Sequence, residues 1–272
     1  MTRVLSALVL LPVVIGTVWF LPPEGTLVLA LLAAVIAFSE YCHLSSALGV
    51  TVPAGIGGAA VVLVCFEMWF ADRTLHANVT HLVLAAAMLV TGAASVGRGR
   101  PVPGLLADAA ATVFAPVYIG LPLGSGAALR ASTAPDGRGL VVLLLVTIAV
   151  SDSAQYYTGR AFGRRQLSPN ISPKKTVEGA VGGVIFATVA MAAGGRYVFG
   201  SPVWMLSILG GVISLLGIVG DLFESQLKRS AGVKDSSQLI PGHGGVLDRI
   251  DSWLFAAPVY YVFVRFVANA AS

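Results

Sequence analysis

Charge is scarce in this sequence. Of its 272 residues, 17 are Lys or Arg and 13 are Asp or Glu, so that 11% are charged, whereas soluble domains carry about 25%. A water-soluble globule of this size needs more charge than that to cover its surface. The apolar fraction of 56% also excludes an extended disordered chain. The composition therefore predicts a protein whose solvent is mostly lipid.

Cysteine is equally scarce. The chain has two, Cys42 and Cys65, and both lie in apolar runs. This excludes a disulfide-stapled secreted scaffold. We interpret both thiols as inert packing residues rather than as a bridge or a metal pair.

Long apolar runs are abundant. A membrane-spanning helix needs about 20 mostly apolar residues. The first run lacks a small-x-small cleavage site before Pro22-Pro23, so we expect a retained helix and not a signal peptide. The sequence predicts an all-α polytopic integral membrane protein with about nine transmembrane helices, near residues 4–21, 26–48, 52–72, 81–97, 104–125, 138–160, 177–199, 202–225 and 248–270.

The distribution of Lys and Arg predicts the orientation of these helices. With the N-terminus in the cytoplasm, twelve basic residues lie inside and five outside, which also places the C-terminus outside. The basic cytoplasmic face suits anionic head groups or phosphates, although topology alone explains part of the bias. The five outside residues are Arg73, Arg130, Arg138, Arg196 and Arg265.

Acidic residues inside spans are costly in lipid and are functional candidates. With this topology, all but Glu67 lie toward the cytoplasmic ends of their helices, which suggests a polar chamber open to the cytosol. We interpret Glu40, Glu67 and Asp108 as helix-end residues that reach the interface. The remaining acids are Asp152, Asp221, Glu224 and Asp251.

The two halves of the chain differ. Residues 1–137 are hydrophobic spans with short loops, which we interpret as a transmembrane scaffold. Residues 138–272 contain two long polar loops, at 160–176 and 226–247. We therefore expect the chemistry in a catalytic region at 138–272.

The end of the eighth span carries polar residues on one face. Asp221, Glu224, Ser225 and Lys228 follow one another at i, i+3, i+4 and i+7, so they share a helix face. Two acids one turn apart could hold a hard divalent cation. An ion pair between Glu224 and Lys228 explains the same spacing, and both interpretations stay open.

The following loop suits a polyphosphate. Glycines beside a helix start let backbone N–H groups face an anion, and the positive end of the ninth span would point at the same place. Asp248 and Asp251 open that span. They are either an ordinary N-cap and an ordinary acid of the first turn, or Asp248 faces Asp221 in a metal clamp. The loop itself contains Lys228, Arg229, Lys234, Pro241, Gly242, His243, Gly244 and Gly245.

The other polar loop has two lysines just before a helix. Lys174 and Lys175 follow Ser172 and Pro173. They could bind phosphate or could simply obey the positive-inside rule, and both interpretations stay open.

The residues of the segment 225–251 resemble the signature of the phosphatidate cytidylyltransferases, also called CDP-diacylglycerol synthases. The resemblance extends upstream to residues 152–160 and 172–179, with departures at Ala154-Gln155 and at Val177. The signature positions are Ser225, Leu227, Lys228, Arg229, Lys234, Asp235, Ser237, Ile240, Pro241, His243, Gly244, Gly245, Val246, Asp248, Arg249, Ile250 and Asp251.

The resemblance implies a reaction in which CTP and phosphatidate give CDP-diacylglycerol and pyrophosphate. It implies direct attack at the α-phosphorus, assisted by Mg²⁺, with room for a second cation. It also implies a homodimer in a membrane, here the bacterial inner membrane, with the site facing the cytoplasm and no nucleic-acid partner.

Together with the residue analysis, the resemblance assigns roles within the site. The expected catalytic residues are Asp221, Asp248, Lys228, Lys234 and His243. Those expected to bind substrate are Ser172, Lys174, Lys175, Ser225, Arg229, Gly244, Gly245 and Arg249. The candidate metal ligands are Asp221, Asp248, Glu224, Asp251 and Asp152.

Two other functions would use similar residues. A cation-coupled transporter would place acids at mid-depth on discontinuous helices, and the sequence shows neither feature. A CTP-dependent lipid kinase would transfer the γ-phosphoryl group and release CDP, and the signature favours the cytidylyltransferase.

Overall fold

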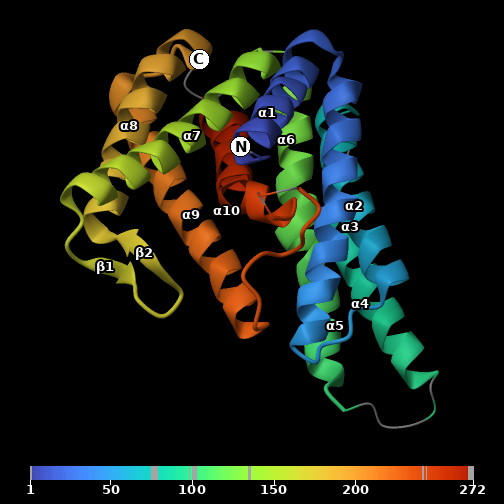
Figure 1. Ribbon diagram of the computed structural model, residues 1–272. Coiled ribbons are helices and arrows are strands. Elements are labelled where there is room, and N and C mark those ends of the chain that lie inside the picture. Colours follow the sequence, from blue (N-terminus) through green and yellow to red (C-terminus); the bar gives the residue numbers. More distant parts are fainter. Residues whose placement is uncertain are drawn as a thin grey trace. The chain divides into compact units, whose positions relative to one another are not determined.

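The structure, a computed structural model, describes residues 2–74, 79–97, 99, 103–133, 136–240, 242 and 244–268. Helices dominate it (Figure 1). Their bounds are α1 Thr2–Phe20, α2 Pro23–Ala47, α3 Ala54–Thr74, α4 Thr80–Val96, α5 Leu105–Ala115, α6 Leu121–Ala131, α7 Gly137–Phe162, α8 Val177–Phe199, α9 Val203–Ser230 and α10 Leu247–Val262. Two π-helical turns, η1 Pro116–Gly120 and η2 Phe263–Ala268, continue α5 and α10.

Each predicted span overlaps one of these helical stretches. Within the described residues, five helical stretches are long and apolar enough to cross a membrane: α2, the α5–α6 stretch Leu105–Ala131, α7, α8 and α9. An all-α membrane protein is thereby confirmed. The total of nine spans and the orientation of the termini stay predictions.

The chain forms two compact units. The first contains Met1–Ala131 and Leu227–Arg249, and the second contains Ser132–Gln226 and Ile250–Ser272. The signature segment Leu227–Arg249 belongs to the same unit as the N-terminal helices. The division into a scaffold at 1–137 and a catalytic region at 138–272 stays a prediction.

In the first unit, small residues let α6 approach α3 closely. A Cβ at Gly124 would lie 2.8 Å from the carbonyl oxygen of Cys65, so only glycine fits there. At the end of α6, the buried Arg130 donates from Nε to the carbonyl of Val18 at 2.7 Å and from Nη2 to that of Leu21 at 2.9 Å. A cation therefore stabilises the C-terminal end of α1.

Two acids of this unit bind backbone amides. Glu67 is buried; it accepts from the backbone N–H of Val79 at 2.9 Å and from the hydroxyl of Thr80, where α4 begins. Asp108 accepts from the N–H of Thr51 at 2.8 Å. Both therefore bind other segments of the protein.

In the second unit, glycines again mark close helix crossings. A Cβ at Gly182 of α8 would lie 2.2 Å from the hydroxyl of Thr158 on α7. A Cβ at Gly220 of α9 would lie 2.5 Å from the carbonyl oxygen of Asp251 on α10. The second crossing brings the backbone beside Asp221 against the first turns of α10.

The loop between α7 and α8 is a small hairpin (Figure 1). Strands β1 Gln166–Ser168 and β2 Ser172–Thr176 pair antiparallel. The hydroxyl of Thr176 accepts from the N–H of Gly179 at 3.1 Å and so caps α8. Lys174 and Lys175 thus lie on an ordered strand, although the sequence predicted only a polar loop.

Candidate active site

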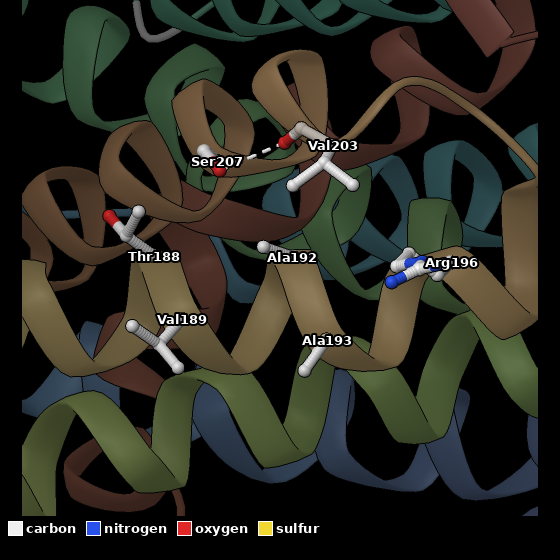
Figure 2. A pocket seen from close by; sticks show the side chains of 7 residues that line it. All are labelled: Thr188, Val189, Ala192, Ala193, Arg196, Val203 and Ser207. Carbon is white, nitrogen blue, oxygen red and sulfur yellow. Dashed lines mark hydrogen bonds between the residues drawn. The ribbon is translucent and has the colours of Figure 1, made fainter.

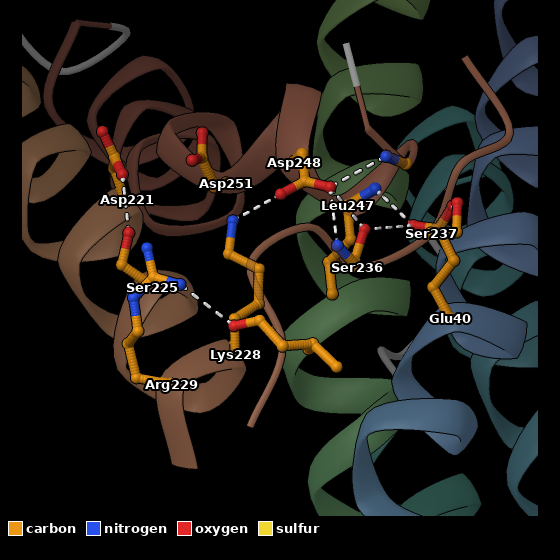
Figure 3. Close-up of polar contacts among 12 residues, drawn as sticks. Glu40, Asp221, Ser225, Lys228, Arg229, Ser236, Ser237, Leu247, Asp248 and Asp251 are labelled. Carbon is orange, nitrogen blue, oxygen red and sulfur yellow. Dashed lines mark hydrogen bonds and ion pairs between the residues drawn. The ribbon is translucent and has the colours of Figure 1, made fainter. Parts of the chain in front are cut away.

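The signature segment of the first unit is organised around Asp248 (Figure 3). Its carboxylate is buried and forms an ion pair with the buried ammonium of Lys228. It also accepts from the N–H of Ser236 at 2.9 Å, from the hydroxyl of Ser236 at 2.7 Å and from the N–H of Gly245 at 2.8 Å. These donors fix the side chain in one position.

Asp248 does not act as an N-cap in this structure. Helix α10 begins at Leu247, whereas a capping side chain precedes its helix and accepts from amides further along the chain. Asp248 instead accepts from Gly245, which lies upstream. The arrangement orients the carboxylate within the segment 236–248.

Glu40 of α2 is the residue that sequence reasoning missed. Its carboxylate, 4% exposed, accepts from the hydroxyls of Ser236 at 3.0 Å and Ser237 at 2.7 Å. It also accepts from the backbone N–H groups of Val246 at 3.0 Å and Leu247 at 2.8 Å. The one sequence signal for this role was an acid within an apolar run, interpreted as reaching the interface.

The glycines of the segment permit this close packing. Gly244 has φ +80°, a conformation that favours glycine, and a Cβ there would lie 2.5 Å from Asp248 Oδ2. A Cβ at Gly245 would lie 2.2 Å from Ser236 Oγ and 2.3 Å from Glu40 Oε1. The N–H of Gly245, assigned to a phosphate nest from sequence, thus has a carboxylate acceptor within the protein. Phosphate binding by Gly244 and Gly245 stays a prediction.

In the second unit, Asp221 is the centre of a polar group (Figure 3). It forms an ion pair with Lys175 of β2 and accepts from the hydroxyl of Ser225 at 3.3 Å. Asp251 of α10 lies within range of the charges of Asp221, Asp152 and Lys175. Three predicted metal ligands from α7, α9 and α10 therefore share one electrostatic environment.

Glu224 and Asp152, the other two predicted metal ligands of this unit, differ in exposure. Glu224 is fully buried. Asp152 is exposed and accepts from Gln155 Nε2 at 3.2 Å. Gln155, a departure from the family pattern, also donates to the hydroxyl of Ser151 at 3.3 Å. That glutamine therefore helps to orient Asp152.

Most predicted phosphate-binding cations are exposed on the surface of the protein. Lys174, Arg229, Lys234 and Arg249 are exposed, and Arg229 donates to the carbonyl of Val233 at 3.1 Å. Ser172 is half-buried on β2. His243 lies outside the described residues. Several cations are thus accessible to a charged substrate.

The acids suit a magnesium ion by their chemistry. Carboxylate oxygens are its preferred protein ligands, and Mg²⁺ usually takes one or two of them and completes its shell with water and phosphate oxygens. Among the residues that the structure describes, no group of three or more His, Cys, Asp or Glu is arranged to hold a metal. Asp221 and Asp251 lie on different helices, α9 and α10, and the charge of Asp221 acts on Asp251. This pair matches the one or two carboxylates that Mg²⁺ usually takes.

A shallow pocket lies elsewhere in the second unit, between α8 and α9 (Figure 2). Small and apolar residues line most of it, with Arg196 at one end, and its volume is about 270 Å³. That is below the usual range for small-molecule sites, roughly 300–1,000 Å³. No acidic residue lines it, so it is unsuited to metal-assisted chemistry.

Comparison with known proteins agrees with the residues of the signature. The sequence profile of the "Cytidylyltransferase family" matches residues 1–267. A phosphatidate cytidylyltransferase from Brucella suis is 32% identical over 262 residues, which cover 96% of this chain and 92% of the relative. One from Staphylococcus haemolyticus is 28% identical over 267 residues, 97% of each chain. One from Mycobacterium leprae is 38% identical over 166 residues, 61% of this chain and 53% of the relative. The chain belongs to the cytidylyltransferase family.

Proposed function

We propose that this protein transfers the cytidylyl group of CTP to phosphatidate and releases pyrophosphate. The observation that carries the proposal is the family match over residues 1–267, in a chain whose segment 225–251 contains every signature position. The membrane setting supports it, because one substrate is a lipid and the other a soluble polyanion. The bacterial relatives support a location in the inner membrane. The excess of Lys and Arg in the predicted inner loops supports a site that faces the cytoplasm.

In this reaction the protein mainly positions the two substrates and neutralises their negative charge. A phosphate oxygen of phosphatidate attacks the α-phosphorus of CTP, and the bond from that phosphorus to the β-phosphate oxygen breaks. Both reactants are anions, so cations must bring them together. We assign this role to Lys174, Lys234 and Arg249, which are exposed. No serine or cysteine nucleophile is required.

We assign Asp221 and Asp251 of the second unit to the magnesium ion, with Asp152 and Glu224 as nearby acids. A role for Asp248 as a metal ligand stays a prediction from the sequence. When bound, the ion would neutralise charge that develops on the triphosphate. Lys175 is the ion-pair partner of Asp221, so its ammonium occupies a place that a metal cation would compete for. In this proposal, Lys175 moves from the carboxylate to a substrate phosphate.

The reaction is tested by where the phosphates of CTP go. Purified protein in detergent with phosphatidate and Mg²⁺ receives CTP labelled at the α- or at the γ-phosphate. We expect the α-label in the lipid and the γ-label in pyrophosphate. A γ-label in the lipid, with release of CDP, would instead identify a lipid kinase and refute the proposal.

The metal assignment is tested with Asp221→Asn, which keeps the side-chain shape but removes the negative charge. We expect kcat to fall by about 100-fold or more, by analogy with the loss of other charge-stabilising groups, and binding of Mn²⁺ by electron paramagnetic resonance to weaken. Asp108→Asn, at an acid of the first unit that accepts from the N–H of Thr51, is the matched control. Equal Mn²⁺ binding in Asp221→Asn and the wild type would remove Asp221 from the metal site.

A further inference from the structure

We propose that Glu40 is a positioning residue for the active site. From α2, its carboxylate holds Ser236, Ser237 and the start of α10 so that Asp248 keeps its working orientation. The part concerning catalysis rests on the proposed function, whereas the part concerning the segment does not. All the residues that carry this inference belong to the first unit.

The contacts of Glu40 are those of an N-cap supplied from far along the chain. The first amides of a helix have no intrahelical partner and need an acceptor. At α10 these include Leu247 N–H, and Glu40 accepts from it and from Val246 N–H. A residue 207 positions away thus does what a neighbouring side chain usually does. The helix start is thereby tied to α2.

Glu40 and Asp248 are linked through one hydroxyl. Ser236 Oγ lies 3.0 Å from Glu40 Oε2 and 2.7 Å from Asp248 Oδ2. A hydroxyl has one proton to donate, so the two carboxylates share it. Loss of the Glu40 carboxylate would release Ser236 toward Asp248 and change the donors that orient it.

Gly245 packs closely against Glu40 and Ser236. The Glu40 carboxylate and the Ser236 hydroxyl occupy the space that its Cβ would need. A glycine of the signature is therefore required by the approach of α2, a requirement that does not depend on the amide binding a phosphate.

The test compares Glu40→Gln with Glu67→Gln. Glu67 is a matched control, because it is also a buried acid that accepts from an amide and a hydroxyl at a helix start, here that of α4. Glutamine keeps the size of the side chain but replaces one acceptor oxygen with an NH2 donor. Because Val246 N–H and Leu247 N–H bind different oxygens of Glu40, one of these two amides loses its acceptor. Amide hydrogen exchange and steady-state kinetics are measured on both variants.

For Glu40→Gln we expect exchange at residues 244–250 to become about tenfold faster, since hydrogen bonds to a charged group are lost. We expect kcat to fall by at least about tenfold while KM for CTP changes little, since a transition-state contact is affected. For Glu67→Gln we expect faster exchange near Thr80 and an unchanged kcat.

Two results would overturn the proposal. Unchanged exchange at 244–250 would show that Glu40 does not hold the segment. Faster exchange with the kcat of the control would show that the held segment does not serve catalysis. If Glu40→Gln does not fold, Ser237→Ala is used instead, because it removes one hydroxyl that donates to Glu40. An unchanged exchange rate at residues 244–250 in Ser237→Ala refutes the proposal. The exchange measurement does not depend on the reaction that the protein catalyses. It therefore tests the contact between Glu40 and the segment even if the proposed function is wrong.

Discussion

Lys228 and Lys234 show how burial separates two residues that look alike in sequence. Both are lysines assigned to phosphate. In the structure Lys228 is buried and paired with Asp248, whereas Lys234 is exposed. The first therefore contributes to folding, and the second is accessible to a substrate.

We predict different outcomes for their alanine variants. Lys228→Ala leaves Asp248 buried without its ion-pair partner and costs about 3 kcal/mol of the free energy of unfolding, visible as a lower Tm in detergent. Lys234→Ala leaves Tm unchanged and raises KM for CTP. Equal Tm values for both variants would contradict the structural role of Lys228.

The sequence could name candidate residues but not their partners. The spacing of Asp221, Ser225 and Lys228 correctly placed them on α9, because helical periodicity is local. It could not show that Asp221 pairs with Lys175 or that Glu40 binds Ser237, because those contacts join segments far apart in the chain. Only packing brings such side chains together.

At the scale of elements, apolar length predicts helices well. The range 177–199 is also that of α8, Val177–Phe199. The range 104–125 ended too early, since Arg130 breaks the apolar run although its guanidinium is satisfied by carbonyls of α1. The strand β2 was missed because its sequence, Ser-Pro-Lys-Lys-Thr, lacks an apolar alternation.

Helix crossings give a prediction about α9. Gly220→Ala would place a Cβ 2.5 Å from the carbonyl of Asp251, so we expect α9 and α10 to separate and both Tm and kcat to fall. Gly211→Ala is the control in the same helix, with its nearest neighbour at 3.4 Å. We expect Gly211→Ala to leave Tm unchanged or raise it slightly. A tolerated Gly220→Ala would contradict this crossing.

At the scale of the whole molecule, the orientation of the chain is the largest prediction still to be measured. We expect single cysteines at Asn170 and Gln238, both exposed, to be labelled only from the cytoplasmic side. A cysteine at Ser201 should be labelled from the outside. The measurement uses an impermeant maleimide on cells, in a background without Cys42 and Cys65. Labelling of Asn170→Cys from outside would overturn the predicted topology.

The way Glu40 reaches its partners also sets an order of assembly. Glu40 and Ser236 are 196 residues apart, and ribosomes add about 5–20 residues per second, so roughly 10–40 s separate the synthesis of the two. During that time α2 carries an acid whose partners do not yet exist. The segment that bears Asp248 gains its contacts with Glu40 only after residues 236–247 have been made, so a product of translation that stops before them would lack a working site.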